Sequence, residues 1–282
     1  MPRAAPHSAQ APRAGVAKLA DMLDERWIMS LHVESMRHAE LADEDGGHVF
    51  FQASTLGALL DCAYDGDLTF AELAEHGNFG LGTSNALDGE MIALDGEFLR
   101  ADVNGDIVPI GPEEQTPFAV VTQFEPTVEA ELAAGLDQEA MLAALDAAAP
   151  PQETSFAVRI DGRFARVRAR SVSPEKQPYR PLTEVVAGQN VFELTDVEGT
   201  MVGFRFPTFI EGIGVPGYHL HFVDRARRRG GHVLDSRSGG PLRARIDPAD
   251  DLHVELPPTV DLSAPDLAAG ARAAIDSIEH DG

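Results

Sequence analysis

The chain of 282 residues contains a single cysteine, Cys62. One cysteine cannot form an internal disulfide, and so low a content is typical of a protein that folds in a reducing cytoplasm. Cys62 lies in the apolar, helix-like stretch STLGALLDCAYDG, which favours an inert buried thiol over a nucleophile. The sequence therefore predicts a cytoplasmic protein without internal disulfides.

Long apolar runs are also lacking. No segment approaches the roughly 18 consecutive apolar residues that a membrane-spanning helix requires. Residues 1–27 are rich in alanine and proline and contain no compact apolar stretch of the kind found in signal peptides. We therefore expect a flexible leader over residues 1–27, and no membrane partner.

Lysine is nearly absent, since only Lys18 and Lys176 accompany the arginines, and the formal net charge is −24. Such an acidic surface repels nucleic acids and anionic membranes, so neither is an expected partner. Two explanations of the composition stay open. A GC-rich genome favours arginine over lysine. A salt-rich cytosol favours dense carboxylates, because salt screens their mutual repulsion.

Two helices are predicted near the start of the first half. Residues 54–66 carry leucines at helical spacing, with Ser54 as the expected N-cap. Residues 68–77 predict a second helix that begins with a capping box of Thr69 and Glu72. From residue 79 onward the spacing changes to that of strands.

Short apolar segments over residues 79–111 alternate with Asp-Gly and Asn-Gly turns, which indicate β-hairpins. An alanine-rich helix is predicted over residues 136–149, and the proline pair at 150 and 151 ends it. This pair is the predicted boundary of an N-terminal α+β domain over residues 28–150.

The second half predicts mainly strands. Residues 154–172 alternate strictly and are expected to form two strands around a turn at Asp161-Gly162. We expect a β-rich domain over residues 151–265, and a helix and tail over residues 266–282. The similarity between DGEFLRA and DGRFARV favours two related halves, each built on β-sheet. The predicted fold class is α+β, with mixed or antiparallel sheets and flanking helices.

Three of the ten histidines lie within PGYHLHFVDRARRRGGHVLD. His219 and His221 are spaced i, i+2, which places both on one face of a strand. A following strand that returned antiparallel would bring His232 opposite them. Three neutral nitrogen ligands with an open position are typical of a catalytic zinc site. The alternative is an ordinary strand pair that carries histidines, with RARRR as a solvated loop.

Two further stretches hold groups that such a site would need. Glu90 follows an Asp-Gly turn, either as a solvated hairpin corner or as a carboxylate directed inward. Arg166, Arg168 and Arg170 share one face of a predicted strand. One guanidinium there could bind a carboxylate substrate through two hydrogen bonds, or the three could form an exposed cationic strand.

Taken together, these segments resemble the alpha-acetolactate decarboxylases. The resemblance covers most of residues 49–235 and depends on blocks that occur in the same order. They are GLGTSNALDGE, TPFAVVTQF, RARSVSPEKQPYRPL, and PGYHLHF followed by GGHVLD. Two positions depart from the family pattern: Cys62 stands where a small residue is expected, and Ser84 where a larger one is common.

The resemblance implies conversion of 2-acetolactate to acetoin and CO2 by a homodimer whose metal site lies in the second half. It implies one Zn²⁺ per chain and no organic cofactor. A C-terminal glutamate is also implied, for which Glu279 is the match and Glu255 the second choice. The implied roles are metal binding by His219, His221 and His232, catalysis by Glu90, Arg170 and Glu279, and substrate binding by Thr83 and Arg170.

The implied chemistry needs a polarised ketone, because loss of CO2 leaves an enediolate that one acid must then protonate on one face. Glu90 and Glu279 are the expected donors. Rival interpretations are a cupin-like oxygenase or a hydrolase, and a metal-binding module that has lost activity. Cupins usually carry a glutamate shortly after His-x-His, where this sequence offers only Asp224.

Overall fold

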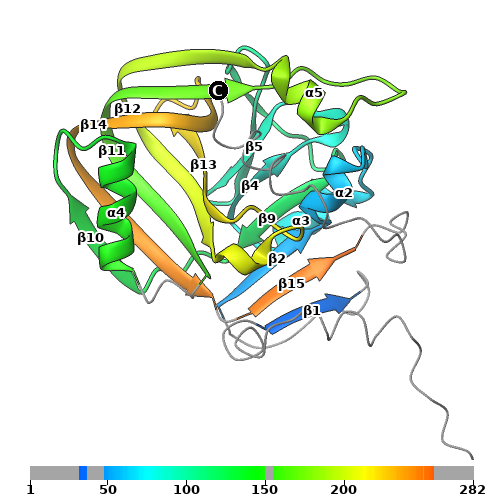
Figure 1. Cartoon of the computed structure of the whole chain (residues 1–282), viewed down its shortest axis with the longest axis horizontal. Coiled ribbons are helices and arrows are strands. Elements are labelled where there is room, and N and C mark those ends of the chain that lie inside the picture. The colour runs from blue at the N-terminus through cyan, green and yellow to red at the C-terminus, as the bar shows by residue number, and fades with distance from the viewer. Residues whose placement is uncertain (1–31, 37–47, 150–154, 250, 257–282) are drawn as a thin grey trace, which may run out of the picture.

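The computed structural model describes residues 32–36, 48–149, 155–249 and 251–256. The predicted leader, the proline pair, and the predicted C-terminal helix with Glu279 lie outside these ranges. The described residues are mainly β-strand and form two large sheets and one small sheet (Figure 1). No helix within them is long and apolar enough to cross a membrane.

The first sheet does not follow the order of the chain. Its strand β15 comes from near the C-terminus, yet it lies between β1 and β2 and runs parallel to both, as Figure 1 shows at its lower right. The other neighbours are antiparallel. The order across the sheet is β1 (His32–Met36), β15 (Asp251–Glu255), β2 (Val49–Ala53), β9 (Phe118–Thr122), β4 (Phe79–Thr83), β5 (Glu90–Leu94), β6 (Glu97–Ala101) and β7 (Ile107–Pro109).

Long strands form the second sheet and close it on itself. Strand β11 pairs along most of β14, and on the other side of β14 its start pairs with β13 and its later part with β10. Strands β11, β12, β13 and β14 therefore form a ring, with β10 on its edge. The strands are β10 (Val128–Leu132), β11 (Ser155–Ser171), β12 (Asn190–Phe206), β13 (Gly217–Asp224) and β14 (Gly230–Ala249), and β3 (Leu68–Thr69) with β8 (Gln115–Thr116) forms the small sheet.

Each predicted domain contributes a strand to the other sheet. Strand β10 precedes residue 150 but pairs with β14, and helix α4 (Gln138–Ala148) packs on the same sheet through Met141 and Leu145. Strand β15 follows residue 150 but joins the first sheet. The relatedness of the two halves stays a prediction.

The main hydrophobic core lies between the two sheets. Phe50 and Ile92 from the first sheet meet Val202 and Phe204 from the second, and the rings of Phe50 and Phe204 pack edge to face with centroids 5.0 Å apart. Helix α3 (Phe70–His76) covers the outer face of the first sheet. The inner faces of the two sheets are thereby held together, so polar side chains on those faces can meet.

The helix caps partly match expectation. Helix α2 spans Leu56–Leu60, and its N-cap is Thr55 rather than Ser54. Ser54 was the wrong choice because it has a positive φ of 64°, whereas Thr55 is extended and its Oγ1 accepts a hydrogen bond from the Ala58 N–H. The capping box of Thr69 and Glu72 in α3 is confirmed.

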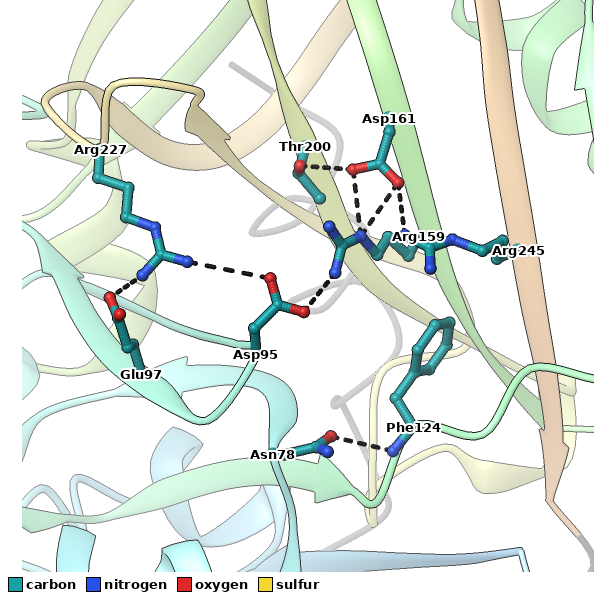
Figure 2. Close-up of polar contacts among 9 residues, drawn as sticks. All are labelled: Asn78, Asp95, Glu97, Phe124, Arg159, Asp161, Thr200, Arg227 and Arg245. Atoms are coloured by element: carbon teal, nitrogen blue, oxygen red, sulfur yellow. Dashed lines mark hydrogen bonds and ion pairs between the residues drawn. The ribbon is translucent and has the colours of Figure 1, made fainter.

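Strand β11 runs without a break through Asp161-Gly162, so the predicted turn there is wrong. Strands β12 and β14 pair with β11 on both sides of this point. The Asp161 carboxylate accepts hydrogen bonds from the Arg245 Nη2, at 2.9 Å, and from the Thr200 Oγ1, at 2.7 Å (Figure 2). Arg159 donates to it from the same strand. Pairing with neighbouring strands and these bonds replace the hairpin.

The predicted hairpin at Asp95-Gly96 is confirmed, and both residues have positive φ. Its Asp95 carboxylate reaches the second sheet, where the Arg159 Nη1 donates to it at 2.6 Å (Figure 2). Arg227, between β13 and β14, forms ion pairs with Asp95 and Glu97. This end of the interface between the sheets is therefore bridged by ion pairs.

Candidate metal centre and active site

The three histidines lie on one face of the second sheet. His221 of β13 is directly opposite His232 of β14, which confirms the predicted antiparallel return. His219 lies two residues before His221 and shares its face. On the other side of β14, Arg170 of β11 is opposite His232. The pairing of these strands thus places three imidazoles and one guanidinium side by side.

The imidazole rings form a compact triangle. The ring centroids of His219 lie 5.0 Å from those of His221 and of His232, and the latter two are 5.4 Å apart. One nitrogen from each ring lies within 4.8 Å of the others. His221 and His232 are buried and His219 is half-buried. The cluster is compatible with a single metal ion.

The His221 ring has a defined orientation. Its Nδ1 lies 2.8 Å from the Met91 carbonyl oxygen, which only accepts, so Nδ1 carries the proton. Burial lowers the pKa of His221 well below its usual value, and the proximity of His219 and of the Arg170 guanidinium lowers it further. The ring is therefore neutral, with a lone pair on Nε2. In metal-binding histidines, the nitrogen that does not bind the metal typically donates a hydrogen bond, as Nδ1 does here to Met91.

The surroundings of Nε2 supply a test of the metal site. The His221 Nε2 is buried, has no hydrogen-bond partner among the described residues, and lies 3.5 Å from the Glu90 Oε2. A lone pair that faces a carboxylate oxygen at this distance is electrostatically unfavourable. A cation bound by the His221 Nε2 and close to the Glu90 carboxylate would remove the conflict, so the residues fit a divalent metal.

Glu90 is buried between the sheets, so its alternative placement at a solvated hairpin corner is wrong. Its Oε1 accepts a hydrogen bond from the Arg170 Nη1 at 3.0 Å, and both side chains are less than a tenth exposed. Glu90 belongs to β5 of the first sheet and Arg170 to β11 of the second. This ion pair therefore joins the sheets beside the histidine cluster.

The backbone before Glu90 explains its position. Gly89 has a φ of +76°, and a Cβ there would lie 2.3 Å from the Ala101 carbonyl oxygen, so the close approach requires glycine. Thr83 of β4 pairs with Glu90, and its Oγ1 donates to the Gly89 carbonyl oxygen at 2.7 Å. The GLGT and LDGE segments thus fix the carboxylate together.

A pocket leads to these groups. It has a cavity volume of about 70 Å³, is partly open to solvent, and combines an apolar wall with four polar residues. The apolar residues come from α2, α5 (Leu182–Ala187) and the intervening strands and loops. The polar lining residues are Thr83, Glu90, Arg170 and His219. Such a pocket suits a small molecule with carboxylate, carbonyl and methyl groups.

Comparison with known proteins decides the family. The family model described as alpha-acetolactate decarboxylase matches residues 50–269. This chain belongs to that family. It is 45% identical to the alpha-acetolactate decarboxylase of Methylococcus capsulatus over 240 residues, which cover 85% of this chain and 91% of the relative. The Methanosarcina mazei relative is 40% identical over 82% of this chain and 80% of its own.

Solved structures agree with this assignment. The crystal structure of alpha-acetolactate decarboxylase from Bacillus subtilis superposes with a TM-score of 0.77 at 36% identity, and covers 82% of this chain and 99% of its own. A Staphylococcus aureus protein described as similar to alpha-acetolactate decarboxylase gives a TM-score of 0.74 at 30% identity. Membership in this family makes the chain a carboxy-lyase.

Some residues predicted for the decarboxylase site lie elsewhere. Glu255 is the last residue of β15 in the first sheet and does not line the pocket. Arg166 forms ion pairs with Asp235 and Glu193, and its side chain is 42% exposed, so of the arginines at 166 and 170 only Arg170 reaches the site. Glu279 lies outside the described residues.

The wall formed by α5 was not predicted. Leu182 and Val186 of this helix line the pocket, and Val185 is buried beside them. The signal is present in PLTEVVAG, where three apolar residues at helical spacing follow Pro181. Only six residues carry it, so the pattern is too short to stand out by periodicity.

Proposed function

We propose that this chain decarboxylates 2-acetolactate to acetoin and CO2, with one Zn²⁺ held by His219, His221 and His232. One observation carries the proposal: the histidine cluster lies beside a buried Glu90–Arg170 ion pair at a small-molecule pocket. The names of the relatives support the substrate. Three neutral histidines and an open position support zinc over metals that prefer oxygen ligands.

The substrate carries its carboxylate beta to a ketone, so the electrons left by CO2 move to the ketone oxygen if that oxygen is polarised. A bound Zn²⁺ would supply this Lewis acidity. The histidines are well suited to hold it, because neutral ligands leave the charge of the ion intact. His221 is fixed by Met91, and Glu90 faces the same space.

The two residues of the ion pair are assigned different roles in the reaction. Arg170 is assigned to the substrate carboxylate, because its planar guanidinium presents several donors. Glu90 is assigned to take up a proton from solvent and to deliver it to the enediolate that remains after CO2 leaves. Thr83 lines the same pocket and holds the backbone before Glu90 through Gly89. Glu279 is proposed as a second acid.

The apolar wall supports a stereospecific product. Leu56 and Leu59 of α2 and Leu182 and Val186 of α5 line the pocket and exclude water from part of it. Methyl groups of the substrate would pack there, while the polar groups lie at Glu90. Protonation from one face then yields one enantiomer of acetoin.

Two readings on one sample test the function: zinc per chain, and acetoin with CO2 formed from racemic acetolactate, against a His219→Ala control. We expect about one zinc per chain, with acetoin formed only by the unmutated protein. Zinc without acetoin would mean a different substrate. If the protein contains no zinc and forms no acetoin, the histidines belong to an ordinary strand pair without a metal.

We further propose that the chain acts as a cytoplasmic homodimer that binds only small molecules. The family resemblance supports the dimer, and the single cysteine supports the compartment. Light scattering on the purified protein gives its molecular mass in solution. A mass of one chain would contradict the dimer.

A further inference from the structure

One wall of the pocket belongs to a segment that lies outside both large sheets. Residues 172–188 connect β11 to β12 and include α5. Val172, Leu182 and Val186 of this segment line the pocket together with Leu56 and Leu59 of α2. Both helices have six residues or fewer, so their placement depends on tertiary contacts rather than on helix stability.

A single carboxylate connects the two walls. Asp65 lies in the turn that follows α2. Its Oδ1 accepts a hydrogen bond from the Tyr179 hydroxyl at 2.6 Å, and its Oδ2 accepts one from the Gln177 Nε2 at 2.8 Å. Both donors belong to the loop that leads into α5. Both Asp65 oxygens therefore bind the segment that carries Val172, Leu182 and Val186.

Other contacts also hold the segment, and its buried apolar residues Leu182, Val185 and Val186 pack in the main hydrophobic core. The Tyr64 hydroxyl donates to the Arg180 carbonyl oxygen at 2.9 Å, and the rings of Tyr64 and Tyr179 are 5.0 Å apart. The Glu175 N–H donates to the Ala86 carbonyl oxygen at 2.7 Å. Between these points, Asp65 holds the side chains of the loop itself.

We propose that Asp65 is a positioning residue that sets the width of the substrate pocket by holding residues 172–188 against α2. The inference rests on the proposed function for its substrate. Asp65 is exposed and does not line the pocket, so it acts through the wall and not on the reacting atoms. Without it, a smaller fraction of molecules would have the closed wall, and the apparent affinity would fall by that fraction.

Variants at this carboxylate separate positioning from catalysis. Asp65→Ala removes both acceptors, and Tyr179→Phe removes one donor while it keeps the ring. Asp65→Asn retains an acceptor for Tyr179, and its amide can pair with that of Gln177. Asp67→Ala is the matched control, because Asp67 is an exposed acid two residues away.

We expect Asp65→Ala to raise KM for acetolactate about tenfold, since it removes two hydrogen bonds, and to leave kcat and zinc content close to those of the unmutated protein. Tyr179→Phe should have a smaller effect, and Asp65→Asn should largely restore KM. Hydrogen exchange measured by mass spectrometry should be faster over residues 173–188 in Asp65→Ala and unchanged in Asp67→Ala.

The proposal is overturned if Asp65→Ala matches Asp67→Ala in KM and in exchange, or if kcat falls while KM stays constant. If Asp65→Ala does not fold, Tyr179→Phe decides by the same two readings. Absence of acetoin with the unmutated protein would refute the proposed function instead. Hydrogen exchange over residues 173–188 would then test the positioning role of Asp65 by itself. Faster exchange in Asp65→Ala would support this role, and exchange equal to that of Asp67→Ala would overturn it.

Discussion

The Glu90 carboxylate faces a different group with each oxygen. Oε1 accepts a hydrogen bond from Arg170. Oε2 lies 3.5 Å from the His221 Nε2, whereas the His221 Nδ1 donates to Met91. The side chain is less than a tenth exposed, so little water reaches these positions. The carboxylate is therefore oriented before any substrate binds, as a catalytic acid must be.

Arg170→Lys tests the role of the guanidinium. Lysine keeps the positive charge but lacks the planar set of donors that can hold Glu90 and a substrate carboxylate at once. We expect kcat/KM to fall about 10- to 100-fold, in line with the loss of a charged hydrogen bond. Arg166→Lys, at an exposed ion pair, is the control. Equal kcat/KM values in the two variants would contradict a role of Arg170 in substrate binding.

At the scale of elements, β13 and the start of β14 were predictable because their pattern is local. His-x-His fixes one face, and the short polar loop between the strands favours an antiparallel return. The single strand β11 was not predictable, because Asp161-Gly162 is a good turn in isolation. Pairing with β12 and β14 decides against the turn, and both partners are remote in sequence.

Asp161 provides a stability test of this strand. Burial raises the pKa of Asp161, but hydrogen bonds from Arg245 and Thr200 and the charge of Arg159 outweigh this and hold it below its usual range. A lowered folded pKa means that ionised Asp161 stabilises the fold above its unfolded pKa. This stabilisation is lost as pH falls through the lower, folded value.

We expect Asp161→Asn to reduce the free energy of unfolding at neutral pH by about 1–3 kcal/mol, and to flatten its decline in acid. Urea denaturation at several pH values measures both effects. Asp196→Asn is the control, because its ion pair with Arg163 is exposed. A decline in acid that is equal in both variants would contradict the role of Asp161.

At the scale of the whole molecule, the site exists only where the two sheets meet. The first sheet supplies Thr83 and Glu90, and the second supplies Arg170 and the histidines. The motifs predicted these residues by family resemblance, but not that they lie across a sheet interface. The exchange of β10 and β15 between the sheets is likewise a long-range feature without a local signal.

Net charge supports a prediction at this scale. Salt weakens the exposed ion pairs, each worth about 0–1 kcal/mol, but it also screens repulsion among the excess carboxylates. With a net charge of −24, repulsion outweighs the pairs. We expect molar KCl to raise the unfolding temperature. No change would favour genome composition as the reason for the scarcity of lysine.

The most direct test of the proposed reaction is the rate of acetoin formation by zinc-loaded Glu90→Gln. The histidines lie on the other sheet, so this variant should keep its zinc. It should lose about 10²- to 10⁴-fold in kcat, because the amide cannot donate the proton that the carboxylic acid supplies. Glu113→Gln, at an exposed position, should behave like the unmutated protein. Full activity of Glu90→Gln at equal zinc content would contradict the assignment of Glu90 as the proton donor.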